Sequence, residues 1–104
     1  MDIFSALSEP TRRSIIEMLA RRGQLSASEI SGSFDMSAPA ISQHLKVLRE
    51  AKLVTVEKKA QQRLYQINLN GMFELRDWVG ELAQLWNDRF DRLEQLLETE
   101  KIKS

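Results

Sequence analysis

The stretch from residue 37 to residue 46 has residue types that suit contact with the bases of DNA. On a helical wheel its apolar residues form one face, and the opposite face carries Pro39, Ser42, Gln43 and Lys46. Small residues in the first turns keep such a helix slim enough to enter a major groove. There the Gln43 amide can pair with N6 and N7 of adenine, and the Ser42 hydroxyl can pair with a donor or an acceptor edge. We therefore predict a DNA-reading helix, against the alternative of short polar residues on an ordinary surface.

Three further residues lie at the borders of this stretch. Ser37 is a candidate N-cap beside free backbone amides that suit a phosphate, and Ala38 is small enough for a close approach. His44 lies at the edge of the apolar face. It is either a half-buried histidine hydrogen-bonded to a neighbouring helix or a phosphate contact. We expect no metal ligation, because the chain has one histidine and no cysteine.

A basic cluster follows the helix, formed by Lys58, Lys59 and Arg63. These residues lie at or near the tip of a predicted hairpin, where a wing reaches the sugar-phosphate backbone or an adjacent minor groove. Clustered cations on a hairpin also serve solubility alone. Their position directly after the predicted reading helix favours a DNA contact.

Capping signals divide the first half of the chain into four helices. We predict a short helix over 3–7, a second over 9–22 that Ser8 caps and Gly23 ends, and a third over 27–33. Ser26 and Glu29 have the spacing of a capping box at the start of the third helix. A tight turn then leads to the helix that follows Ser37, so the third and fourth helices form a helix-turn-helix.

From residue 53 the apolar period changes to two, and "LVTVEKK" and "RLYQINL" predict a hairpin around the tip "AQQ". After Asn70 and Gly71, apolar residues at steps of three and four predict a long last helix. We predict a mainly α-helical fold with a small β-hairpin, a winged helix-turn-helix with the order helix, helix, helix, helix, strand, strand, helix. A single domain is expected over residues 1–98, and a frayed polar tail over 99–104.

Charge is sorted along the chain although its net value is zero. Residues 1–36 carry four basic and five acidic side chains, residues 37–65 carry six and two, and residues 66–104 carry five and eight. The positive block coincides with the predicted helix and wing, which suits a domain with one face toward an anion. The chain has no apolar run of membrane-spanning length and no signal peptide, so a cytoplasmic protein is expected.

The last helix has a wider apolar stripe than a winged core of this size needs to cover. Left in water, such a patch favours aggregation. We predict that it pairs with the first helix in a symmetric interface between two copies. The interface residues are expected to be Ile3, Phe4, Leu7, Trp86, Phe90, Leu93 and Leu97.

The segments "PTRRSIIEML" and "SAPAISQHLKVLREAKLV" resemble the second helix and the recognition helix of the arsenic-repressor-like (ArsR/SmtB) family of transcriptional repressors. The resemblance covers nearly the whole chain. It implies a winged-helix homodimer that binds a palindromic operator in double-stranded DNA, with the first and last helices at the dimer interface. The DNA contacts that it implies are Ser37, Ala38, Pro39, Ser42, Gln43, His44, Lys46, Lys59 and Arg63.

The chain departs from the metal-sensing members of that family. It has Ser28 and Ile30 where those members have a Cys-x-Cys motif, and its last helix has Asp77 and Glu81 but no histidine. The ending "DWVGELAQLWNDRFDRLEQLLE" is instead similar to the branch of autorepressors that do not sense metals. The resemblance therefore implies repression without a metal or another cofactor. The sequence identifies neither a small-molecule nor a protein inducer.

Two other classes of function compete with a DNA-binding repressor. A winged-helix adaptor would hold another protein with its hairpin or long helix, and the zero net charge suits it. The acid-free face over residues 38–46 argues against it, and binding of a duplex that weakens as salt rises distinguishes the two. We expect no enzyme activity, because the chain lacks cysteine, has one histidine and has no glycine-rich phosphate loop.

Overall fold

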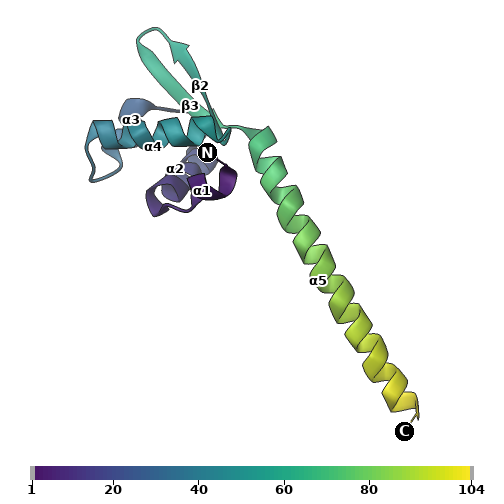
Figure 1. Ribbon diagram of the computed structural model, residues 1–104. Helices are drawn as coiled ribbons and strands as arrows, with labels where there is room; N and C mark the ends of the chain where they lie inside the picture. The colour runs from purple at the N-terminus through teal and green to yellow at the C-terminus, as the bar shows by residue number, and fades with distance from the viewer. Residues whose placement is uncertain (1, 104) are drawn as a thin grey trace. The chain divides into compact units, whose positions relative to one another are not determined.

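The structure is a computed structural model that describes the backbone of residues 2–103 and the side chains of residues 2–99. It is mainly helical with a small antiparallel sheet (Figure 1). The elements are α1 (Ile3–Leu7), α2 (Pro10–Arg22), β1 (Leu25–Ser26), α3 (Ala27–Gly32), α4 (Ala38–Glu50), β2 (Val54–Lys59), β3 (Gln62–Ile67) and α5 (Leu69–Lys103). The chain divides into two compact units, Met1–Phe73 and Glu74–Ser104.

Helix α2 begins one residue later than the sequence predicts. Its N-cap is Glu9, whose carboxylate accepts a hydrogen bond from the Arg12 amide at 3.1 Å. Pro10 at the first helical position forces the residue before it into an extended conformation, and this makes Glu9 the cap. The predicted cap, Ser8, instead ends α1, where its hydroxyl donates to the Ser5 carbonyl at 2.7 Å.

The predicted capping box at the start of α3 is present. The Ser26 hydroxyl accepts from the Glu29 amide, and the Glu29 carboxylate accepts from the Ser26 amide, both at 3.1 Å. The hydrogen bond from the Ser26 amide holds the pKa of Glu29 below its ordinary value. This reciprocal pair fixes the first turn of the helix-turn-helix.

Helix α4 ends in a tight reversal at Lys52, which has a positive φ of 63°. The Lys52 amide donates to the Arg49 carbonyl and the Leu53 amide to the Leu48 carbonyl, each at 3.0 Å. Leu48 and Leu53 are fully buried, so the pattern is a Schellman motif with its apolar contact. It directs the chain from α4 straight into the hairpin.

The sheet has three strands in the order β1-β3-β2, and the sequence predicted only two of them. Strand β1 pairs Leu25 with Tyr65 and Ser26 with Leu64. A strand of two residues has no alternation that a sequence pattern can reveal. The turn of the hairpin consists of Ala60 and Gln61. Gln62, the third residue of the predicted tip, is the first residue of β3.

Helix α5 begins at Leu69, whereas the sequence predicted that it starts after Asn70 and Gly71. Gly71 lies inside the helix, where a Cβ would overlap the carbonyl oxygen of Lys52. Asn68 donates its side-chain amide to the same oxygen at 2.9 Å. Glycine is therefore required by close packing against the α4–β2 junction and does not mark a break.

The core of the first unit lies among α1–α4 and the base of the β2–β3 hairpin, whose tip extends past the helices in Figure 1. The core consists of Ala6, Ile15, Leu19, Leu25, Ile30, Ile41, Leu45, Leu48, Ala51, Leu53, Val54 and Tyr65. Ile41, Leu45 and Leu48 are the buried residues of α4, which agrees with the single apolar face expected for this helix.

The second unit is the remainder of α5. Its backbone is helical to Lys103. Large apolar side chains along it are exposed, and the Trp86 and Phe90 rings lie 5.6 Å apart between centroids. None of the helices among the described residues combines the length and the hydropathy of a membrane-spanning segment.

Candidate DNA-binding surface

The outward face of α4 is arranged as the sequence predicts. Ser37 is the N-cap, and its hydroxyl accepts from the Ala40 amide at 3.3 Å. The other residues predicted for this face are exposed: Ala38, Pro39, Ser42, Gln43 and Lys46. They lie opposite the buried side of the helix and leave its N-terminal half narrow and free of acid.

A small polar hollow joins α4 to the hairpin. It has a volume of about 120 Å³ and is lined by Ser42, Gln43, Lys46, Arg49, Arg63 and Tyr65. None of these residues is acidic, so three cations surround one opening. Arg49 was missed by the sequence analysis, although it follows Lys46 at the three-residue spacing of one helix face.

The three predicted wing cations do not share one face. Lys58 is the register partner of Arg63, and Lys59 is the partner of Gln62. Partners lie on the same side of a sheet and neighbours along a strand on opposite sides, so Lys58 and Arg63 face one way and Lys59 the other. Arg63 shares its side with Tyr65, and this side faces α4.

His44 lies against α2. Its imidazole Nδ1 is 3.2 Å from Nη1 of Arg12 and 3.8 Å from a carboxylate oxygen of Glu9, and its side chain is 18% exposed. This agrees with the first of the two interpretations, a half-buried histidine bonded to a neighbouring helix. Desolvation acts to raise the pKa of Glu9, but the hydrogen bonds from the Arg12 and Thr11 amides contribute to lowering it overall.

The predicted interface residues differ in exposure. Ile3 and Leu7 pack partly against the core of the first unit, and Phe4 beside them is half exposed. The four residues predicted on α5 are 52–60% exposed: Trp86, Phe90, Leu93 and Leu97. Among the described residues no group of three or more histidine, cysteine or acidic side chains is placed to hold a metal ion.

A helix-turn-helix whose second helix presents polar groups beside a basic hairpin defines a class of DNA-binding regulators, the winged helix-turn-helix proteins. A family described as "Helix-turn-helix domain" matches residues 7–57. Over 97 residues the chain is 37% identical to an HTH-type transcriptional regulator of Mycobacterium tuberculosis, covering 93% of this chain and 87% of that protein. Over 78 residues it is 33% identical to the transcriptional repressor SdpR of Bacillus subtilis, covering 75% and 86%.

Solved structures agree with these relatives. An ArsR-like transcriptional regulator from Rhodococcus sp. RHA1 has a TM-score of 0.75 and 26% identity, covering 90% of this chain and 88% of that one. A possible transcriptional regulator for arsenical resistance has a TM-score of 0.71 and 35% identity, covering 85% and 96%. The chain belongs to the ArsR family of DNA-binding transcriptional regulators.

Proposed function

We propose that the protein is a homodimeric repressor that binds a palindromic operator and works without the metal sites of the arsenic-sensing members. The observation that carries this proposal is the acid-free hollow in which α4 and β3 present Gln43, Lys46 and Arg63 together. Amide and hydroxyl groups read base edges there, and the cations contact phosphates.

In this proposal the recognition residues divide into two roles. Pro39, Ser42 and Gln43 enter the major groove, with Ala38 allowing the close approach. Ser37, Lys46, Lys58, Lys59 and Arg63 contact the sugar-phosphate backbone. His44 contributes by holding α4 against α2 through Arg12, because its ring is already engaged there. Arg49 joins the phosphate contacts, since it lines the same hollow.

A single recognition helix contacts only a few base pairs, too few to select one operator in a genome. Two copies spaced by one helical turn of DNA, about 34 Å, double the readout. The exposed stripe on α5 supports pairing of two copies, because it holds two aromatic and two leucine side chains on one side of a helix. In the first unit, Phe4 of α1 is the exposed residue of the predicted interface, while Ile3 and Leu7 pack partly against the core of that unit.

The residues present support the proposal that release does not require a metal. The region from residue 27 to residue 33 has serine and isoleucine where arsenic sensors have thiolates, and thiolates are the ligands that a soft metal requires. Release then depends on something other than metal binding.

The proposal is tested by selecting bound fragments from a random pool of duplexes, then measuring the affinity of the selected fragment against salt. We expect a two-fold symmetric site and an affinity that falls steeply and linearly on logarithmic axes as salt rises. A chain that binds no duplex at low salt contradicts the proposal and favours a winged-helix adaptor for another protein. An asymmetric site bound by one copy contradicts the dimer alone.

A further inference from the structure

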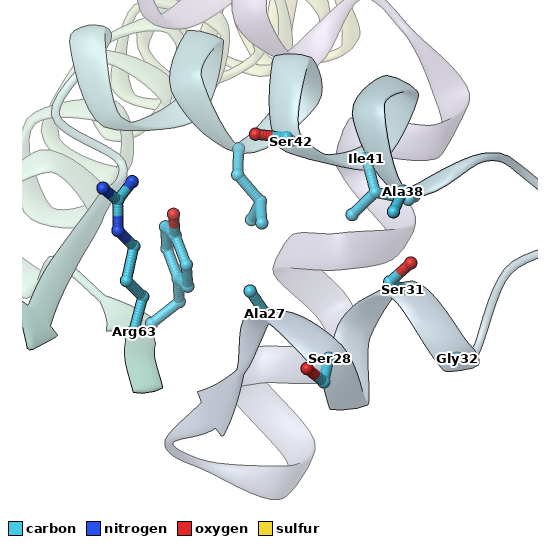
Figure 2. Close-up of a pocket in the computed structure, with 10 residues that line it drawn as sticks. Ala27, Ser28, Ser31, Gly32, Ala38, Ile41, Ser42 and Arg63 are labelled. Atoms are coloured by element: carbon cyan, nitrogen blue, oxygen red, sulfur yellow. The ribbon is translucent and has the colours of Figure 1, made fainter. Parts of the chain in front are cut away.

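A second, larger cavity of about 500 Å³ lies between α3, α4 and β3 (Figure 2). Ala27 and Ser31 of α3 face Ala38 and Ile41 of α4 across it, and Arg63 extends along one side. The volume lies within the range of small-molecule sites, about 300–1,000 Å³. Residues of the proposed operator surface and of the core both line it, the former being Ala38, Ser42 and Arg63 and the latter Ile41, Leu45 and Tyr65.

The cavity exists because the facing residues are small. On α3 the face is made by residues at positions one, two, five and six of the helix, namely Ala27, Ser28, Ser31 and Gly32. On α4 the first residue of the corresponding face is Ala38. Ile41 and Leu45 lie deeper and are buried, so the floor of the cavity is apolar.

Tyr65 places a polar group beside the cavity. The residue is 6% exposed and lines both the large cavity and the polar hollow. Within the described part of the chain its hydroxyl has no hydrogen-bond partner, and the hydroxyl remains accessible to solvent. It can therefore donate a hydrogen bond to a molecule that occupies the cavity.

The charge at the mouth of the cavity selects an anion. Ser42, Arg63 and Tyr65 line both spaces, so the apolar cavity opens directly onto the hollow that holds Lys46 and Arg49. None of the residues that line either space is acidic. A ligand that matches this arrangement has an apolar body and one anionic end.

We propose that this cavity binds a small monocarboxylate with a compact apolar body, which acts as the effector of the repressor. Its carboxylate pairs with the Arg63 guanidinium and accepts from the Tyr65 hydroxyl, and its body lies over Ile41 between α3 and α4. The regulatory part rests on the proposed function. Bound carboxylate occupies Arg63 and covers Ser42, so the ligand and DNA compete for the same residues.

Binding is tested first without DNA, by the methyl resonances of the full chain in carbon-13 NMR. The probes are benzoate, cyclohexanecarboxylate and octanoate, with benzamide as the neutral control for benzoate. We expect saturable shifts of the Ala27, Ala38 and Ile41 methyls with at least one carboxylate, little change at Ile15 in α2, and at least tenfold weaker binding of benzamide. If no carboxylate produces saturable shifts, or benzamide binds equally well, the proposal is wrong.

Four variants locate the site. Arg63→Gln should weaken carboxylate binding at least tenfold and Tyr65→Phe about threefold, because each removes one polar partner and keeps most of the shape. Ser31→Leu should abolish binding by filling the cavity. Lys59→Gln removes a cation from the other face of the hairpin and should leave carboxylate binding unchanged. Equal effects of Arg63→Gln and Lys59→Gln would show general charge attraction and overturn the assignment.

Competition is tested separately with a labelled duplex. A saturating carboxylate should raise the apparent Kd of the wild type for DNA at least tenfold. Ser31→Leu, first checked for an unchanged thermal unfolding transition, should bind DNA normally and ignore the carboxylate. If that variant is unfolded, the NMR titration of Arg63→Gln tests whether the carboxylate binds at this cavity. If the wild type binds no duplex even without a carboxylate, the proposed function is wrong. If a bound carboxylate does not displace the duplex, only the effector role is wrong.

Discussion

His44 of α4 and Arg12 of α2 meet at 3.2 Å between Nδ1 and Nη1. Arg12 also donates through Nε to the Ala6 carbonyl at 2.6 Å and through Nη2 to the Ser5 carbonyl at 3.3 Å. Because a guanidinium can only donate, Nδ1 is the acceptor and the ring proton lies on Nε2. One side chain of α2 therefore holds both the end of α1 and the middle of the recognition helix.

Replacing this arginine tests the connection. Arg12→Ala should lower the free energy of unfolding by about 1–3 kcal/mol, since it leaves two carbonyls and an imidazole without their donor. Urea denaturation measures the change. Arg13→Ala is the matched control, because Arg13 is exposed and its side chain donates one hydrogen bond, to the Leu7 carbonyl of α1 at 2.7 Å, and none to α4. Equal losses for the two variants would mean that the additional contact of Arg12 with His44 of α4 contributes nothing measurable.

Gln43 and Arg63 should affect DNA binding differently. Gln43→Ala should reduce discrimination at one base pair by about 1–3 kcal/mol and leave non-specific affinity nearly intact, because it removes a base contact. Arg63→Ala should weaken all sequences alike and reduce the salt slope by about one, because it removes a phosphate contact. Fluorescence anisotropy on operator variants measures both. If Arg63→Ala reduced base discrimination and Gln43→Ala weakened all sequences alike, the wing would read the bases and α4 would contact the phosphates.

The α5 stripe is tested by sedimentation at several concentrations. Trp86→Ala should weaken dimerisation by about 2 kcal/mol or more, as is usual for a large aromatic at the centre of an interface. Asp91→Ala is the control, because Asp91 lies about 140° from Trp86 on the helical wheel. A dimer that is unchanged by the tryptophan substitution would place the interface elsewhere.

The junction between α4 and β2 gives two substitutions of opposite sign. Lys52→Gly should stabilise the protein by up to about 1 kcal/mol, because Lys52 has a φ of 63° that costs a residue with a Cβ more than it costs glycine. Gly71→Ala should destabilise it by more than about 1 kcal/mol, because the new methyl group overlaps the Lys52 carbonyl. Thermal unfolding measures both, and two shifts in the same direction would contradict this packing.

Acid should weaken the helix-turn-helix through Glu29. The pKa of Glu29 is lowered from 4.5 by the hydrogen bond from the Ser26 amide, so the unfolded chain binds protons more readily than the folded one. The stability that this group contributes is complete above its unfolded pKa and is lost as pH falls through the lower folded pKa. Glu29→Gln should therefore flatten the fall in Tm between about pH 5 and pH 3. Glu17→Gln controls for loss of one negative charge, and an equally flattened curve would exclude the capping box as the cause.

The parts of this fold that sequence reasoning predicted well are those with a local cause. The Ser26–Glu29 box, the Ser37 cap and the inward face of α4 each depend on residues within two turns of one another. The parts that it missed depend on distant partners. Strand β1 exists because Leu25 meets Tyr65, forty positions later, and α5 starts early because Gly71 fits against Lys52.

The candidate site divides in the same way. The exposed face of α4 follows from helical periodicity, whereas the role of Arg49 and the opposite facing of Lys59 depend on how the hairpin registers and packs. The cavity under Tyr65 was beyond sequence reasoning. It forms because α3 and α4 have small side chains on facing surfaces. The sequence does not show which surfaces of two helices face each other.

Strand β1 also sets how the hairpin bends. Its two residues pair with Leu64 and Tyr65 of β3, so the base of the hairpin has three strands. Lys58 and Arg63 lie beyond this pairing, where the hairpin has two strands. A ribbon of two strands twists more easily than a sheet of three. We expect the two-stranded tip to bend while the three-stranded base stays fixed beside the first turn of α3. Such bending would let the wing fit grooves of different width while α4 keeps its orientation.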